Sequence, residues 1–177
     1  MLTNDALPPL LISGPVPGGT ATVSVQSAAV PLTASAQFAQ TMFANDPASA
    51  SLPSMPGYTF PFGIVGFRLE NVGLGNAVTL RIQYPGNVPA SAEYWKHGPQ
   101  GWHQIPMARI NATTIEITLT DGGVGDTDAA QDGTITDPGG LAVLAAPGGA
   151  AAIPALSPFA LALLAAGLGL LGWRRRS

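Results

Sequence analysis

Glycine and proline occur too often along this chain for long helices to form. There are 22 glycines and 17 prolines among 177 residues, and both residue types interrupt regular helix. Only 10% of the residues are charged, against about 25% in an ordinary soluble domain. The chain is therefore expected to fold as short strands joined by turns, and an all-helical enzyme is excluded.

Apolar and polar residues alternate in several short segments, as they do in strands with one solvent-exposed face. The alternation occurs at 20–26, 65–70, 78–84 and 114–120, with a weaker candidate at 38–43. Residues 94–97 and 102–105 flank the turn sequence Gly98-Pro99-Gln100-Gly101 and predict a hairpin. This spacing of strands and turns is typical of an all-β antiparallel β-sandwich.

The pattern divides the chain into four parts. Residues 20–146 are expected to form the β-sandwich, 147–152 a linker, and 153–177 a C-terminal segment of different composition. Residues 1–19 are interpreted as a linker or the remnant of a longer chain, because they contain neither a positive region nor an unbroken apolar run. We therefore expect the chain to be the C-terminal part of a longer product, or its start to be misassigned.

Charge and residue content exclude several functions. Residues 1–173 carry four basic side chains against ten acidic ones, which argues against a nucleic-acid partner. The absence of cysteine excludes disulfides, thiol catalysis and zinc–thiolate sites. No Gly-x-Ser-x-Gly sequence accompanies the serine, histidine and aspartate residues. The chain is not expected to be an enzyme.

An acidic, glycine-rich segment lies in the second half of the chain. It holds five of the ten acidic residues: Asp121, Asp126, Asp128, Asp132 and Asp137. Carboxylates this close repel one another unless they are solvated or neutralised, and oxygen ligands on a flexible loop suit Ca²⁺. The spacing is not that of an EF-hand, because Gln131 stands where the sharp turn needs glycine. Two interpretations stay open: a structural calcium site formed by these aspartates, and a solvated Asp/Gly turn cluster.

The predicted hairpin carries two further candidate sites. His97 and His103 could be metal ligands facing each other, but no third ligand is evident nearby, so ordinary strand positions are the preferred interpretation. Trp95 and Trp102, with Tyr94, could form a platform on which a carbohydrate stacks; the alternative is that they pack on the sheet. The Trp95/Trp102 face thus offers a second function, that of an adhesin or carbohydrate-binding module.

Several motifs together resemble the U-type "choice-of-anchor" domains of bacterial surface proteins: Phe60-Pro61-Phe62-Gly63, Tyr94-Trp95-Lys96-His97-Gly98-Pro99, Trp102, and the run Asp121–Gly140. Such domains precede varied C-terminal anchors. The resemblance implies a non-enzymatic module of the cell surface whose anchor follows the β-sandwich.

The C-terminal segment has the composition of a membrane span. No charged residue occurs from Pro138 to Trp173, and the 21 residues from Ile153 to Trp173 are nearly all Ala, Leu, Gly and Phe. A helix of this length reaches roughly 30 Å, the thickness of a bilayer's hydrocarbon core. The sequence therefore predicts a transmembrane helix that includes Phe159. Trp173 would lie at the interface, with Arg174, Arg175 and Arg176 in the cytoplasm and the β-sandwich outside.

A short motif opens this segment: Ile153-Pro154-Ala155-Leu156-Ser157. Followed by an apolar run and a terminal arginine cluster, it resembles the IPTL-type variant of the PEP-CTERM sorting signals, although Ala155 replaces the usual threonine. The resemblance implies that an exosortase-type membrane protease recognises the motif, cuts the chain and passes the protein on. We expect transient residence in the inner membrane of a Gram-negative bacterium, followed by a place at the cell surface or outside the cell.

Overall fold

The computed structural model describes residues 10–28, 32, 35–44, 46 and 51–146. Within these residues the chain forms strands and no helix. The strands are β1 (Leu11–Val16), β2 (Gly19–Ala28), β3 (Gln37–Met42), β4 (Tyr58–Thr59), β5 (Val65–Glu70), β6 (Ala77–Gln83), β7 (Glu93–Gly98), β8 (Gly101–Ile105), β9 (Met107–Arg109), β10 (Thr114–Thr120) and β11 (Ile135–Leu144).

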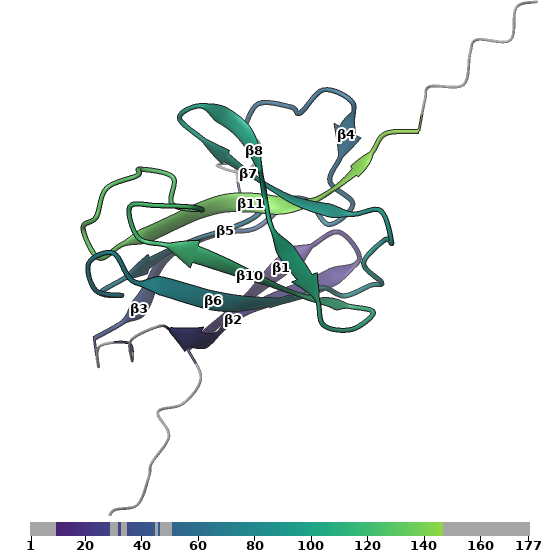
Figure 1. Cartoon of the computed structure of the whole chain (residues 1–177). Helices are drawn as coiled ribbons and strands as arrows, with labels where there is room; N and C mark the ends of the chain where they lie inside the picture. Colours follow the sequence, from purple (N-terminus) through teal and green to yellow (C-terminus); the bar gives the residue numbers. More distant parts are fainter. Residues whose placement is uncertain (1–9, 29–31, 33–34, 45, 47–50, 147–177) are drawn as a thin grey trace, which may run out of the picture. The chain divides into compact units, whose positions relative to one another are not determined.

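The strands form two antiparallel sheets that lie as two layers (Figure 1). One sheet has the order β1-β2-β6-β10-β9, and the other has the order β3-β5-β11-β7-β8, with β4 paired to β11. Every strand pair is antiparallel. The prediction of an all-β antiparallel fold is therefore confirmed for the described residues, and its two layers make it sandwich-like.

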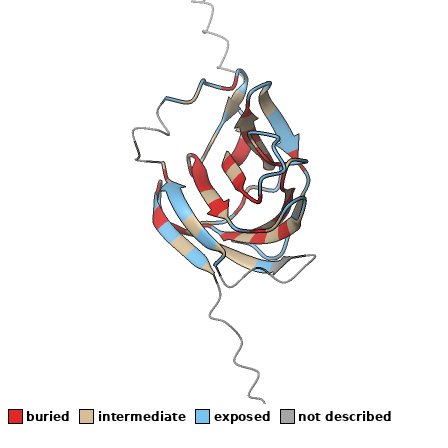
Figure 2. Ribbon diagram, turned by 90° about the vertical axis from the view of Figure 1, so that its left-hand side faces the viewer, coloured by how far each residue is buried: buried red, intermediate tan, exposed pale blue. Residues whose placement is uncertain are grey.

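A single apolar core lies between the two layers. Burial alternates along β6, where Leu80 is fully buried and pairs with the buried Ile117 of β10. Leu69 and Leu141 enter the same core from β5 and β11. Figure 2 shows buried positions alternating with intermediate and exposed ones along the strands. Burial of each such side chain stabilises the fold by about 1.5–3 kcal/mol. The face of each strand that carries the apolar residues of the period-two pattern is therefore the face that packs inward.

The sequence pattern does not predict β1, β4, β9 or β11, and two of these strands alter the predicted organisation of the chain. β1 pairs with β2 along its whole length, so the folded unit begins before residue 20 and includes part of the predicted 1–19 linker. β11 occupies the second half of the predicted Asp/Gly turn cluster. It contains Pro138, Gly139 and Gly140, which are poor strand formers, so its pattern did not indicate a strand. Tertiary pairing with both β5 and β7 overrides that local preference.

The predicted transmembrane helix, the sorting motif and the arginine cluster all lie outside the described residues. Among the residues that the structure does describe, none belongs to a helix long and apolar enough to cross a bilayer.

Candidate functional site

The buried carboxylate of Asp121 holds two loops against the end of β10. Its Oδ1 accepts hydrogen bonds from the backbone amides of Asp132, Gly133 and Thr134 at 3.3, 3.0 and 3.1 Å. Its Oδ2 accepts one from the amide of Gly75 at 2.6 Å. Converging amides neutralise a buried carboxylate much as they neutralise a bound anion. Both oxygens of Asp121 are therefore occupied by the protein's own backbone.

Asp126 is the second buried carboxylate of the acidic segment. It accepts hydrogen bonds from the amides of Gly122 and Thr136 at 2.9 and 3.1 Å. Burial raises the pKa of Asp126, these two amides lower it, and the neighbouring charge of Asp128 raises it again. The net direction is upward, because the loss of solvation outweighs the amide bonds.

Asp128 and Asp132 are exposed and close small turns. Asp128 accepts a hydrogen bond from the amide of Ala130, and Asp132 accepts one from the amide of Thr134, both at 2.9 Å. A carboxylate bonded to the amide two residues later is the usual Asx turn. These two residues therefore have the local role that the turn interpretation assigns to them.

The five predicted calcium ligands do not come together as one ligand set. Asp121 and Asp126 face backbone amides, and Asp137 lies on β11 beside a lysine. In the part of the chain that the structure describes, no group of three or more acidic or histidine side chains has the arrangement of a metal site. The geometry favours the turn interpretation over the calcium site, and thermal melting with and without calcium decides between the two.

Asp137 belongs to a buried polar cluster in the inner face of the second sheet. Lys96 of β7 and Asp137 of β11 are 0% and 1% exposed, and their Nζ and Oδ1 atoms are 3.4 Å apart. The hydroxyl of Tyr94, also fully buried, donates to Asp137 Oδ2 at 2.9 Å. The second oxygen, Oδ1, has no hydrogen-bond donor in good geometry among the residues that the structure describes. The cluster thus contains an ammonium group, a carboxyl group and a phenol in contact.

Two backbone carbonyls complete the surroundings of Lys96. Its Nζ donates to the carbonyl oxygen of Gly125 and, at 2.9 Å, to that of Thr136. Gly125 has a φ of 85°, and a Cβ there would collide with the side chain of Leu119. Only glycine places this carbonyl over the ammonium without strain.

The cluster also needs a residue without a side chain opposite Lys96. Register places Gly139 directly across from Lys96. A Cβ on Gly139 would lie 2.7 Å from Tyr94 Oη and 2.9 Å from Asp137 Oδ1. The glycine that weakens the local strand preference of β11 is therefore required by the cluster.

Burial dominates the electrostatics of the cluster. It raises the pKa of Asp137, although Lys96 and the Tyr94 hydroxyl lower it. Burial also raises the pKa of both Tyr94 and Tyr84, and the nearby Asp137 charge adds to this. The tyrosines therefore stay protonated, and the neutral form of Asp137 is more accessible than that of an exposed aspartate.

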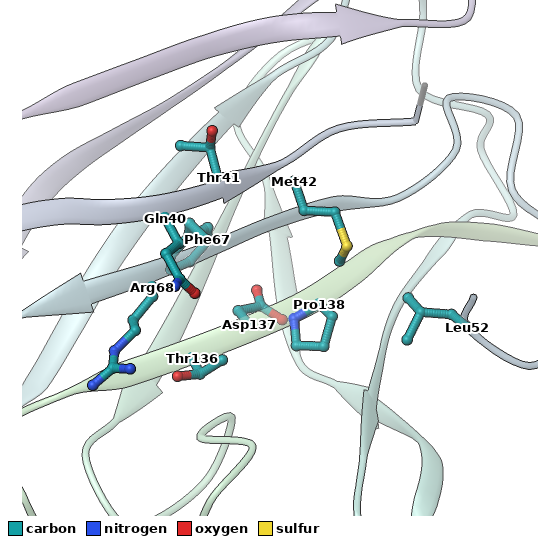
Figure 3. Close-up of a pocket in the computed structure, with 9 residues that line it drawn as sticks. All are labelled: Gln40, Thr41, Met42, Leu52, Phe67, Arg68, Thr136, Asp137 and Pro138. Carbon is teal, nitrogen blue, oxygen red and sulfur yellow. The ribbon is translucent and has the colours of Figure 1, made fainter. Parts of the chain in front are cut away.

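Asp137 also borders a groove of 480 Å³ on this sheet (Figure 3). The groove lies along β3, β5 and β11, with Met42 and Leu52 toward one end and Arg68 toward the other. Since Asp137 is only 1% exposed, the groove reaches little of its surface.

The hairpin of β7 and β8 separates its two histidines. His97 pairs with Trp102, whereas His103 pairs with Lys96. Neighbouring pairs project to opposite faces of a sheet, so the two histidines do not face each other. This agrees with the interpretation of both as ordinary strand residues.

The aromatic residues of the hairpin also divide between the two faces. Tyr94 points into the core, so it does not share a platform with Trp95 and Trp102. Both indoles are half-buried: Trp95 packs on Tyr58 with ring centres 5.4 Å apart, and Trp102 packs on Phe60 at 5.0 Å. The Trp102 Nε1 donates to the carbonyl of Pro53 at 3.0 Å. The segment before β5 therefore covers part of the aromatic face.

The C-terminal segment resembles a known family. Residues 151–177 match the IPTL-CTERM motif. The match does not extend into the sandwich, and neither the curated proteins nor the solved structures contain a match to the chain. The IPTL-CTERM match confirms the predicted sorting signal and supports a secreted or surface-sorted protein. The similarity of residues 58–140 to choice-of-anchor domains stays a prediction.

A sorting signal of this type implies a processing protease and passage through the membrane. It also indicates a destination at the cell surface or outside the cell. The IPTL-CTERM motif contains all the residues of the predicted sorting motif and anchor. It therefore accounts for the composition of the C-terminal segment.

Replacing Asp121 by asparagine should destabilise the sandwich. The amide group of asparagine has one acceptor oxygen and one donor NH₂, so the Gly75 amide or the three amides at Oδ1 lose their acceptor. We expect the free energy of unfolding to fall by about 2–4 kcal/mol, measured by urea denaturation followed by tryptophan fluorescence. The matched control is Asp128→Asn, an exposed turn residue, which should change it by less than about 0.5 kcal/mol. Equal effects of the two substitutions would contradict the role of Asp121.

Calcium removal should leave the melting temperature unchanged. Backbone amides and Lys96 already neutralise the three buried aspartates, so the folded state has little repulsion for a divalent cation to relieve. The measurement is thermal melting of the full chain in millimolar Ca²⁺ and in excess chelator. If calcium bound only the folded state with a dissociation constant near 10⁻⁴ M, it would add about 1.4 kcal/mol. A calcium-dependent rise that is lost in Asp128→Ala would instead establish the calcium site.

Proposed function

We propose that this chain is a non-enzymatic surface module: a β-sandwich exported and then anchored or released through its C-terminal exosortase-type signal. The observation that carries the proposal is the IPTL-CTERM match at residues 151–177, which follows β11, the last strand that the structure describes, after a short connecting segment. The sandwich also supports the proposal, because its buried polar residues form hydrogen bonds between loops and strands and so have a structural role. The module would present or space sequence that lies before it.

The module has features suited to a location outside the cell. It contains no cysteine, so oxidation of thiols cannot alter it. Four of the five aspartates in its acidic segment accept hydrogen bonds from backbone amides, an arrangement that needs no cofactor. Loops held by buried hydrogen bonds unfold locally only rarely. Because proteases cut the locally unfolded chain, such loops resist proteolysis. These properties serve a spacer or display module.

The membrane stage of the proposal follows from the C-terminal composition. Ile153–Trp173 would span the inner membrane until the exosortase-type protease cuts near the motif, with Arg174–Arg176 as the cytoplasmic stop. Proline at 154 and 158 disfavours regular helix at the outer end of this segment, where the motif lies. An extended end at the outer surface of the bilayer is accessible to a membrane protease.

The sorting step can be tested with a pair of proline substitutions. In cells that contain the matching protease, the wild-type chain should lose the segment after the motif and reach the cell surface or medium. Pro154→Ala should slow cleavage and leave uncut protein in the membrane fraction, because it alters the recognised motif. Intact mass and cell fractionation measure both effects.

The matched control for that test is Pro147→Ala, which lies before the matched residues 151–177. It should be processed as the wild type is. An uncut tail on wild-type protein at the surface, or normal processing of Pro154→Ala together with the control, would contradict the proposed sorting role.

The alternative function, an adhesin or carbohydrate-binding module, is favoured by one observation. A pocket of 420 Å³ lies beside the aromatic face and is lined in part by Tyr58, Phe60 and Trp102. Sugars bind by stacking on half-exposed aromatic rings of this kind. The rings in this pocket also pack on one another, so a structural role competes with binding.

A polysaccharide-binding assay on the full chain separates the two functions. If the aromatic face binds sugar, Trp102→Ala should weaken binding at least about tenfold, and Trp95→Ala should weaken it less, because Trp95 does not line the pocket. The control is Leu74→Ala, a residue 71% exposed elsewhere on the surface, which should bind as the wild type does. No binding across a broad set of glycans would leave these aromatics with a packing role alone.

A further inference from the structure

The buried cluster of Lys96, Asp137 and Tyr94 is unusual for a stabilising ion pair. Isolated charges are costly to bury, and a buried pair is often no more stabilising than apolar residues of the same size. A good charge-assisted hydrogen bond between nitrogen and a carboxylate oxygen is about 2.7–2.9 Å long. Here Nζ and Oδ1 are 3.4 Å apart, and within the described part of the chain Oδ1 has no hydrogen-bond donor in good geometry. The amine and the carboxyl group are therefore in contact, at a distance longer than that of a good charge-assisted hydrogen bond.

We infer that Lys96 and Asp137 are the reacting pair of an intramolecular condensation that joins β7 to β11 by an amide bond between Lys96 Nζ and Asp137 Cγ. The geometry provides a nucleophile and a carboxyl group held in contact, in a site from which water is excluded. Holding reactants together in this way removes most of the entropic barrier of a bimolecular step.

The reaction needs no co-reactant. One proton passes from the Lys96 ammonium to the Asp137 carboxylate, which leaves a neutral amine and a neutral carboxylic acid. The nitrogen lone pair attacks Cγ, one carbon–oxygen bond breaks, and that oxygen leaves as water with two of the three original ammonium protons. The product is an uncharged amide, so the cost of burying two charges disappears.

The neighbouring groups suit each stage of this step. The Tyr94 hydroxyl donates to Asp137 Oδ2, so it polarises the carboxyl group before attack and remains as a donor to the amide oxygen. Burial raises the pKa of Asp137, which favours the protonated, electrophilic form. The small Gly139 leaves room for the carboxyl group between Tyr94 and Lys96.

The carbonyl groups around Lys96 also fit the product. The nitrogen of the amide product keeps one hydrogen. It can therefore donate a hydrogen bond to only one of the two carbonyl oxygens that the ammonium contacts. The carbonyl of Thr136 already accepts hydrogen bonds from both the hydroxyl and the amide of Thr127, at 2.8 and 3.1 Å. The remaining N–H is therefore free for the carbonyl of Gly125, and no buried carbonyl loses its partner.

The cross-link would replace the covalent support that the chain lacks. With no cysteine there is no disulfide, and a bond between residues 96 and 137 closes a long loop in the unfolded state. β11 is the last strand before the matched residues 151–177. A load applied through an anchored C-terminus would reach β11 first; this consequence, unlike the bond itself, rests on the proposed function.

Mass spectrometry of the denatured full chain tests the inference directly. The wild-type chain should be lighter than its sequence mass by one water. Trypsin should not cut after Lys96, because an acylated lysine is not a substrate, and the peptide that contains Lys96 should stay joined to the one that contains Asp137. A chain of full mass that trypsin cuts after Lys96 would show a plain ion pair and overturn the inference.

Two variants and a chemical control complete the experiment. Lys96→Arg keeps the positive charge but lacks the amine, so it should have the full mass and melt on the order of 10 °C below the wild type. Tyr94→Phe should lower the cross-linked fraction at a given time after synthesis, an effect that a purely structural tyrosine would not produce. An equal cross-linked fraction would overturn the role of Tyr94.

The chemical control concerns another route to water loss. Aspartate followed by glycine can cyclise to a succinimide, and Asp121-Gly122 and Asp132-Gly133 have this sequence. Mild base opens a succinimide and restores the lost water, whereas the Lys96–Asp137 amide survives it. Water loss that disappears in base, together with tryptic cleavage after Lys96, would count against the cross-link even if the first mass agreed.

Discussion

The ammonium group of Lys96, fully buried in the core of a sandwich, constrains much of the structure around it. A buried charge must find an opposite charge and hydrogen-bond acceptors inside the protein. Asp137 supplies the charge, and the carbonyls of Gly125 and Thr136 supply the acceptors. The turn at 125, the course of β11 and the small residue at 139 all follow from this requirement.

The acidic segment is the second consequence of buried polar groups. In the sequence its five carboxylates resemble the ligands of a cation, but in the fold four of them accept hydrogen bonds from backbone amides and the fifth, Asp137, lies beside Lys96. Asp121 alone accepts four such amides. Loops without regular pairing must satisfy their backbone donors in some way, and here aspartate side chains do so. The same residue type therefore serves two different physical needs.

The two parts of the chain relate to function in different ways. The IPTL-CTERM motif specifies a destination through a short linear sequence that a protease reads, so it can be found without a fold. The family match does not extend into the sandwich, and the sandwich is of interest for the buried polar contacts that stabilise it. A covalent bond between β7 and β11 would make the delivered module resistant to force and unfolding without cysteine chemistry, which suits a domain displayed outside the cell.

The sequence by itself determined the all-β class, most of the central strands and the sorting signal. These depend on local information: residue period, turn residues and a linear motif. Only the tertiary structure decided that β11 is a strand and that Asp137 lies beside Lys96, away from the other aspartates. It also decided that Tyr94 lies on the face of β7 opposite to the tryptophans. Each depends on register between segments far apart in sequence, and no local pattern encodes which carboxylate will face which amine. Lys96 shares a face of β7 with Tyr94, as the period-two pattern indicates. Because Tyr94 and Trp95 place an aromatic residue on each face, the pattern did not show which face packs in the core.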